Sequence, residues 1–225
     1  MPRVVAVIGQ AIAVFRPALV VIACNTASTI ALPALRAQFS VPFVGTVPAI
    51  KPACAASVSR RVTVLGTEAT VGREYTRALI REFSQGCEVT LVGAAQLATL
   101  AERDLRGEPV ADAEIEAQIA PCFVETEGRR TDTVVLACTH YPLLLGQMQR
   151  LAPWPVEWID PAPAIARRVT DLLGPRSETA QPEPSLALFT ASREPSAALV
   201  QALSGLGLNQ CGKFDTRFDT PAHSA

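Results

Sequence analysis

Two cysteines, Cys24 and Cys138, occur in nearly matching stretches: VVIACNTAS at residues 20–28 and VVLACTHYP at residues 134–142. Each stretch is an apolar run followed by Ala-Cys and small polar residues, which predicts a strand that ends at the cysteine and leads into a helix. In open parallel sheets, ligands bind at such strand ends. A thiol at the start of a helix also feels the positive end of the helix dipole, which stabilises the thiolate. Both cysteines are therefore candidates for reactive thiols.

The residues after the two cysteines carry groups that suit an anionic substrate. They are Asn25, Thr26 and Ser28 in the first stretch and Thr139 in the second. Beside a helix N-terminus, hydroxyl and amide donors bind carboxylate or phosphate readily. The alternative is that Thr26 and Ser28 only cap the helix, which their residue types equally allow.

One of the two histidines of the chain, His140, is the second residue after Cys138. An isolated histidine is often structural, but one beside a candidate thiol can tune it or relay its proton. The other, His223, is expected to be idle in the tail. Two thiols facing one small anion suggest inversion of a carbon centre. One thiolate takes a proton from one face while the opposite thiol donates one, and the reverse direction exchanges the roles.

Composition indicates a globular protein with no special electrostatic partner. Hydrophobic residues make up 49% of the 225 residues and charged residues 18%, with a formal net charge of −1. This balance gives no indication of binding to nucleic acid or to an acidic surface. The six cysteines are widely spread, which argues against a metal site or a redox pair and favours reduced thiols in the cytoplasm. Four of them are expected to be small buried hydrophobes: Cys54, Cys87, Cys122 and Cys211.

Residues 4–24 are nearly all apolar and resemble a signal peptide or a membrane span. Gln10 and the pair Arg16-Pro17 interrupt the run, however. The remaining apolar residues follow a helical spacing at Val5, Ile8, Ile12 and Phe15. We therefore expect a buried helix followed by a buried strand, and no membrane segment.

Short β-rich runs alternate with helical patterns along the whole chain. Several of the runs are apolar throughout, as expected for strands covered on both faces. This alternation predicts an α/β protein with a parallel sheet and flanking helices. The expected strands are residues 18–24, 41–47, 61–67, 88–94, 132–138, 156–160 and 185–191, and the longest expected helices are residues 27–39, 71–84 and 111–127.

Several longer motifs follow the pattern of one known family in order and spacing. They are ACNTAS (23–28), PFVGTVPAIKPA (42–53), LGTEATV (65–71), LACTHYPLL (136–144) and WIDPAPAIARRV (158–169). Over almost its whole length the chain resembles the glutamate racemases, within the cofactor-independent aspartate/glutamate racemase superfamily. The Cys-Thr-His-Tyr-Pro segment is more similar to glutamate racemases than to their aspartate or hydantoin relatives.

The resemblance implies roles for particular residues. Cys24 and Cys138 would be the catalytic acid/base pair, with Cys24 addressing the D-isomer and Cys138 the L-isomer. His140 would assist Cys138. The residues that would bind the carboxylates and the ammonium group of glutamate are Asn25, Thr26, Thr70 and Thr139.

The resemblance also implies a fold and a biological setting. The expected fold has two similar lobes, each a mostly parallel sheet with flanking helices, and an active site in the cleft between them. Residues 1–50 and 160–225 would form the first lobe and residues 51–159 the second. The product, D-glutamate, would serve peptidoglycan synthesis. No metal, cofactor, nucleic acid or membrane is expected, and the partners would be an amino-acid substrate and, as a homodimer, a second copy.

Two family motifs have no counterpart in this chain. Family members open with a strand that ends in Asp-Ser-Gly, followed later by a Pro-Tyr-Gly loop, and both hold substrate. We therefore expect the first lobe to be incomplete at its N-terminus and the 225-residue chain to racemise glutamate weakly or not at all. Glu102 occupies the family's acidic position and is interpreted first as a solvated glutamate near a helix start, with a supporting role beside the site as the alternative.

Two other hypotheses about function stay open. In one, the chain is a non-catalytic short form of the racemase, either a binding or regulatory protein or a decayed gene product. In the other, it is a hydrolase that uses Cys138 as the nucleophile and His140 as the base. The hydrolase hypothesis is the weaker, because it leaves Cys24 without a role.

Overall fold

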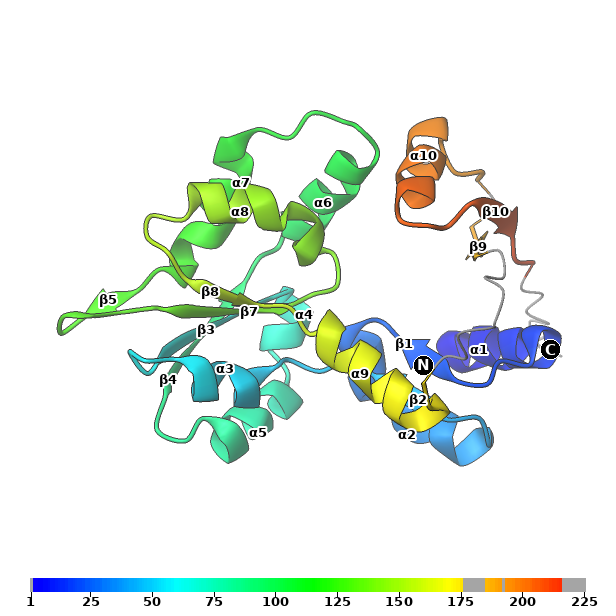
Figure 1. Cartoon of the computed structure of the whole chain (residues 1–225), viewed down its shortest axis with the longest axis horizontal. Coiled ribbons are helices and arrows are strands. Elements are labelled where there is room, and N and C mark those ends of the chain that lie inside the picture. The colour runs from blue at the N-terminus through cyan, green and yellow to red at the C-terminus, as the bar shows by residue number, and fades with distance from the viewer. Residues whose placement is uncertain (1, 176–184, 192, 216–225) are drawn as a thin grey trace, which may run out of the picture.

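Four strands form a central parallel sheet in the order β4-β3-β7-β8 (Figure 1). The structure is a computed structural model that describes residues 2–175, 185–191 and 193–215. The four strands are β3 (Arg61–Gly66), β4 (Glu88–Gly93), β7 (Thr133–Ala137) and β8 (Glu157–Ile159). Every residue of β3 and of β7 is buried, which explains why both strands have nearly continuous apolar sequences.

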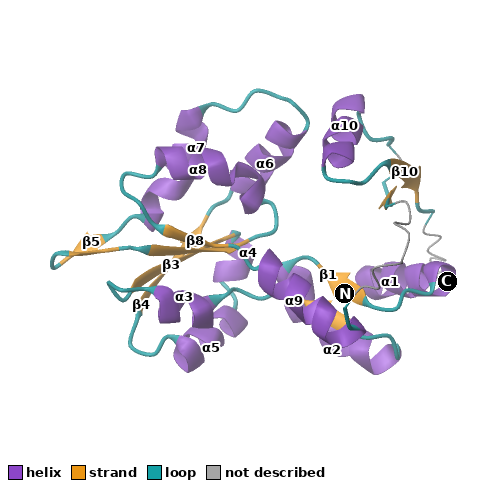
Figure 2. Cartoon of the chain, viewed as in Figure 1, coloured by secondary structure: helices purple, strands orange, loops and turns teal. Residues whose placement is uncertain are grey.

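Helices cover both faces of the central sheet (Figure 2). Within β7, Val134 and Leu136 pack into one buried cluster, whereas Val135 and Ala137 pack into another. This alternation is the period-two geometry of a strand. The first cluster lies under α6 (Leu97–Leu105), α7 (Asp112–Ile119) and α8 (Leu145–Leu151), and the second under α3 (Ile50–Ala56) and α5 (Glu74–Phe83).

Two smaller parallel sheets lie outside the central sheet. One pairs β1 (Val20–Ile22) with β2 (Phe43–Gly45), and the other pairs β9 (Leu186–Phe189) with β10 (Gln210–Lys213). β2 ends in Gly45 close to α2: a Cβ atom there would overlap the side chain of Leu32, which would have to shift. The helices in this part are α1 (Pro2–Phe15), α2 (Asn25–Gln38), α9 (Ala162–Leu173) and α10 (Ala197–Gly205).

Five short elements complete the described part. They are α4 (Glu68–Val71), η1 (Ala120–Cys122), β5 (Glu125–Thr126), β6 (Arg129–Arg130) and η2 (Tyr141–Leu144). β5 and β6 form an antiparallel hairpin whose turn places Glu127 at φ 52° and Gly128 at φ 72°. The helix predicted over residues 111–127 is therefore too long: after η1 the chain becomes extended and reverses at this left-handed turn.

The α/β class, with parallel sheets and flanking helices, is confirmed. Each of the seven predicted strand segments contains a strand. The division into lobes of residues 1–50 with 160–225 and residues 51–159 stays a prediction.

The prediction that α1 is a buried helix is wrong. Among the described residues of α1 none is buried, although Val5, Ile8 and Ile12 are half-buried against α2. Phe15 is 47% exposed and contacts Phe214, with 5.7 Å between the ring centroids. The helical stripe is real, but it packs on the small cluster formed by α2, β1 and β2 and stays only half-buried there.

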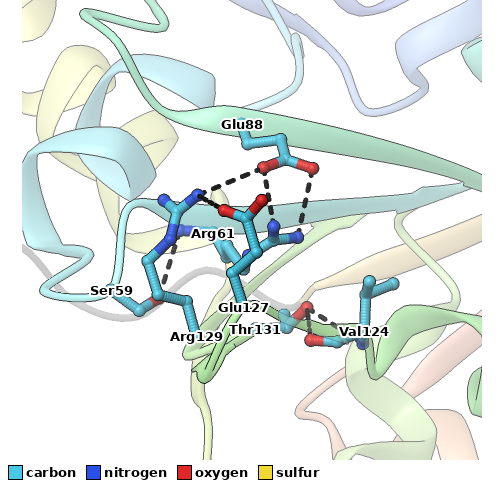
Figure 3. Close-up of polar contacts among 7 residues, drawn as sticks. All are labelled: Ser59, Arg61, Glu88, Val124, Glu127, Arg129 and Thr131. Atoms are coloured by element: carbon cyan, nitrogen blue, oxygen red, sulfur yellow. Dashed lines mark hydrogen bonds and ion pairs between the residues drawn. The ribbon is translucent and has the colours of Figure 1, made fainter.

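A network of polar side chains lies at the amino edge of the central sheet, where β3 and β4 begin (Figure 3). Arg61, at the start of β3, bonds Glu88, at the start of β4, through both carboxylate oxygens, at 3.1 and 2.9 Å. Arg129 of the hairpin approaches the same carboxylate at 3.7 Å. Because the Arg61 side chain is only 5% exposed, this bidentate pairing satisfies a charge that would otherwise be costly to bury. Polar side chains near the opposite, carboxyl edge remain available for a site.

No helix within the described ranges combines the length and the apolar character that a membrane crossing needs.

Candidate active site

The two candidate cysteines lie at the carboxyl ends of parallel strands. Cys24 follows β1 and is the N-cap residue of α2, where its sulfur accepts a hydrogen bond from the Ala27 N–H at 3.5 Å. Cys138 directly follows β7 and precedes η2. The prediction that each cysteine loop opens a helix thus holds fully only for Cys24, since the second loop leads into a four-residue 3-10 helix before α8 begins.

A hydrogen bond joins the two cysteine loops. The Thr139 hydroxyl donates to the Ala23 carbonyl at 3.1 Å, and these residues are the immediate neighbours of Cys138 and Cys24. Segments far apart in the sequence therefore meet at this point. The two cysteines differ in exposure, because Cys138 is 9% exposed whereas Cys24 is an exposed residue.

Asn25 presents a buried amide beside Cys24. The residue is 4% exposed, and neither its oxygen nor its nitrogen has a hydrogen-bond partner among the described residues. Unsatisfied buried polar groups are costly and concentrate where ligands bind. The Ser28 hydroxyl, by contrast, donates to the Ile22 carbonyl and accepts from the Thr46 N–H, both at 2.9 Å. Ser28 therefore serves the fold, and Asn25 is the better candidate for contacting a substrate.

Threonines connect the end of β1 with the end of β3. The hydroxyls of Thr26 and Thr70 lie 3.5 Å apart, and Thr70 also pairs with the Thr67 hydroxyl at 3.0 Å. Thr67 caps α4, the short helix that follows β3. Three strand ends, those of β1, β3 and β7, therefore contribute hydroxyl groups to one region. Such groups can both donate to a carboxylate and accept from an ammonium group.

His140 links Cys138 to a carboxylate. Its Nδ1 lies 3.9 Å from the Cys138 sulfur, and its Nε2 lies 2.8 Å from Oε1 of Glu102 on α6. The interaction with the Cys138 sulfur is the main cause that raises the pKa of His140 from 6.5 to about 9. Burial opposes this shift, and Glu102 adds to it. An imidazolium at this position donates toward the sulfur and stabilises a thiolate there.

The interpretation of Glu102 as a solvated residue near a helix start is wrong. Glu102 lies well inside α6, and both of its carboxylate oxygens are bonded, to His140 and to Arg106. The alternative, a supporting role beside the site, fits the geometry. No local sequence signal encodes this contact, because His140 lies 38 positions further along the chain.

The remaining cysteines lie outside the Cys24 and Cys138 loops. Cys54 and Cys122 are buried, and burial raises the pKa of each thiol to about 12, which keeps them protonated. Cys87 is also buried, but Cys211 is only half-buried on β10, so its predicted burial is wrong. His223 lies outside the described residues. Within the described ranges, no group of three or more His, Cys, Asp or Glu side chains is arranged to hold a metal ion.

The structure is thus an α/β fold that presents two thiols at strand ends, in loops that a hydrogen bond joins. A family model described as Asp/Glu/Hydantoin racemase matches residues 3–169. The chain belongs to this family.

Known relatives agree with this assignment. The chain is 54% identical over 210 residues to a glutamate racemase of Brucella anthropi, an alignment that covers 92% of this chain and 75% of the relative. The crystal structure of Escherichia coli glutamate racemase, in complex with L-glutamate and the activator UDP-MurNAc-Ala, matches with a TM-score of 0.86 at 35% identity. That match covers 96% of this chain and 81% of the other. The structure of the glutamate racemase isoform RacE1 of Bacillus anthracis, at 22% identity and a TM-score of 0.73, supports the fold.

Proposed function

We propose that this chain interconverts L- and D-glutamate by proton transfer at two thiols, without metal or organic cofactor. The observation that carries the proposal is the hydrogen bond from Thr139 to Ala23, because it joins the loops of Cys138 and Cys24 in one region. Glutamate as the substrate is supported by the relatives, which are glutamate racemases. We infer that the D-glutamate serves peptidoglycan synthesis.

The reaction needs one base and one acid on opposite faces of the α-carbon. From D-glutamate, the Cys24 thiolate takes the α-proton and the Cys138 thiol donates its proton to the other face. From L-glutamate the roles are exchanged. Each turnover leaves the proton on the other cysteine, so no proton is consumed. His140 stabilises Cys138 in the thiolate state that begins the L-to-D direction, and Glu102 holds the imidazole in place.

Substrate binding is assigned to the polar groups between the strand ends. The buried amide of Asn25 has a free donor and a free acceptor within the described structure, so it can hold a carboxylate and an ammonium group together. Thr26 and Thr70 supply hydroxyls at the ends of β1 and β3, and Thr139 supplies a hydroxyl at the Cys138 loop.

The direct test is exchange and inversion at the α-carbon. The purified chain is incubated with D-glutamate in D₂O, the optical signal is followed by circular dichroism, and deuterium at the α-carbon is measured by NMR. Inversion accompanied by incorporation of one solvent deuterium is the expected result, and a low rate of inversion meets it. If glutamate binds without exchange, the chain is a non-catalytic binding form, and the proposed activity is wrong.

A second candidate, a thiol hydrolase, is favoured by one observation. Cys138, His140 and Glu102 form a chain of contacts at 3.9 and 2.8 Å, the order in which a nucleophile, a base and an orienting carboxylate are arranged. This function does not involve Cys24. Replacement of Cys24 by alanine therefore separates the candidates, because a hydrolase would retain its activity and a two-thiol racemase would lose it.

The cellular setting follows from the same assignment. We place the protein in the cytoplasm, where its cysteines, all free in the structure, would stay reduced. A homodimer stays a prediction, which the molecular mass in solution tests by light scattering.

A further inference from the structure

Arg106 contacts the carboxylate that holds His140, although it touches neither cysteine loop in any described bond. Oε2 of Glu102 accepts a hydrogen bond from Nη2 of Arg106 at 2.7 Å, while Oε1 faces Nε2 of His140 at 2.8 Å. The two oxygens of a single carboxylate are thus divided between a cation on the same helix and the imidazole of the Cys138 loop.

The backbone fixes both ends of this arrangement. Arg106 is the C-cap residue of α6 and lies four positions after Glu102, so the two side chains share one face of the helix. His140 is the N-cap residue of η2, and its carbonyl accepts a hydrogen bond from the Leu143 N–H at 3.1 Å. The Glu102 carboxylate lies between the side chains of these two residues.

We propose that Arg106 is a positioning residue: by holding one oxygen of Glu102, it keeps the other aimed at His140 and thereby keeps His140 against Cys138. This inference deepens the proposed function and rests on it for the catalytic role of Cys138. Without Arg106, a 35% exposed glutamate side chain is free to leave the imidazole for water.

Charge alone predicts the opposite effect from positioning. Arg106 is a cation that partly neutralises Glu102, so its removal, with Glu102 still in place, would favour the imidazolium. If Arg106 positions Glu102, its removal takes the carboxylate away and disfavours the imidazolium. The direction in which the His140 titration moves therefore distinguishes the two effects.

The charged groups near His140 and Glu102 come from several elements. His140 faces Cys138 in its own loop and Glu102 from α6, and Glu102 faces Arg106. Glu102 and Arg106 also line an open groove of about 760 Å³ together with three charged side chains that have no described bond to Glu102: Glu108, Arg193 and Glu194.

The test is an NMR titration of His140 in the full chain. With only two histidines present, its signal is assigned by the variant His223→Gln. The variants are Arg106→Met, which keeps an unbranched side chain, Arg106→Lys, which keeps the charge, and Glu102→Gln, which defines the full contribution of the carboxylate. Arg150→Met is the matched control, because Arg150 forms a comparable exposed pair with Asp112 at 2.8 Å on other helices.

We expect Arg106→Met to lower the titration midpoint of His140 from about 9 toward 6.5, by about half or more of the drop in Glu102→Gln. In Arg106→Lys the midpoint should stay closer to its wild-type value than in Arg106→Met. Arg150→Met should leave the midpoint unchanged. An unchanged or higher midpoint in Arg106→Met overturns the proposal.

A kinetic measurement connects the titration to the reaction. In Arg106→Met, the pH profile of kcat/KM should shift in the same direction as the midpoint, with a loss of about threefold to tenfold near pH 8. If the parent chain does not racemise glutamate, the proposed function fails, whereas the titration still decides whether Arg106 positions Glu102.

Discussion

The two cysteine loops share a sequence pattern but rest on different supports. Cys138 follows β7, whose residues are all buried between two layers of helices. Cys24 follows β1, a three-residue strand in which Val21 is 38% exposed. One thiol is therefore held by a packed core and the other by the edge of a small sheet.

The polar surroundings of the two cysteines differ in the same way. The Cys138 sulfur contacts His140, which in turn contacts the Glu102 carboxylate. The Cys24 sulfur instead accepts a hydrogen bond from the Ala27 N–H at the start of α2. The Cys138 sulfur thus faces an ionisable side chain, and the Cys24 sulfur faces the backbone dipoles at the start of α2. A motif can be repeated in sequence while the physical means of activating it differ.

The largest expected effect is the fall in the racemisation rate when either thiol is removed. Cys24→Ala and Cys138→Ala should each lower racemisation by about 10²-fold to 10⁴-fold or more, because each removes one of the two proton-transfer groups. Polarimetry or circular dichroism from both isomers measures the loss. The unequal supports of the two loops make no difference here, since every turnover of the proposed reaction uses both cysteines. Inversion at wild-type rates in either variant would contradict the two-thiol mechanism.

Matched leucine truncations compare the packing of the two regions. Leu136 in β7 and Leu35 in α2 are both fully buried, but Leu136 belongs to a much larger cluster. Leu136→Ala should cost about 4–5 kcal/mol of unfolding free energy and Leu35→Ala about 2–3 kcal/mol, because the smaller cluster can collapse around the cavity.

Urea unfolding followed by two probes measures this pair. Both tryptophans, Trp154 and Trp158, lie near the central sheet, so their fluorescence reports that region, while far-UV circular dichroism reports the whole chain. Leu35→Ala should shift the circular dichroism transition more than the fluorescence transition. Equal shifts in both signals would show that the two regions unfold as one unit.

The sequence predicted the central sheet well because its two inner strands, β3 and β7, are buried on both faces. Short β-branched and apolar runs such as TVVLA of β7 are typical of such strands. Prediction failed where a contact partner decides the outcome. The apolar stripe of α1 indicated a buried helix, yet its burial depends on how much structure packs against it, which the stripe itself does not encode.

The residues of the site also differ in whether the sequence could predict their role. The cysteines, Asn25 and His140 could be found because they lie within or beside a repeated motif. The bond of Glu102 to His140 could not be found from the residues alone, since it depends on how α6 packs against η2. The resemblance to a family pointed to the position of Glu102, but only the geometry assigns it a partner.

A pH series tests the support that is particular to Cys138. The pKa of His140 is raised from 6.5 to about 9, so its stabilising contribution is complete below pH 6.5 and is lost as the pH rises through 9. In wild type, the free energy of unfolding should therefore fall between pH 6.5 and 9. Glu102→Gln should weaken this dependence and lower kcat/KM near pH 8 by about tenfold or less. Chemical denaturation at several pH values provides the measurement, and a wild-type slope retained in Glu102→Gln would contradict the assigned contact.

The smallest expected effect concerns the bond between the two loops. Thr139→Val removes the hydroxyl that donates to the Ala23 carbonyl, and Thr139→Ser keeps it. Ala23 is exposed, so water can replace the lost donor, and the cost should be about 0.5–1.5 kcal/mol, or about threefold to tenfold in kcat/KM. Steady-state kinetics on both isomers measures this cost.

The form of the Thr139 effect separates its two proposed roles. If the hydroxyl mainly binds glutamate, Thr139→Val raises KM and leaves the free protein unchanged. If it mainly joins the loops, the same variant also separates the fluorescence and circular dichroism transitions in urea without any substrate, because the packed and the exposed supports lose a connection. Since the Thr139 hydroxyl already donates to Ala23, we expect the second result, and coincident transitions in Thr139→Val would assign the residue to substrate binding alone.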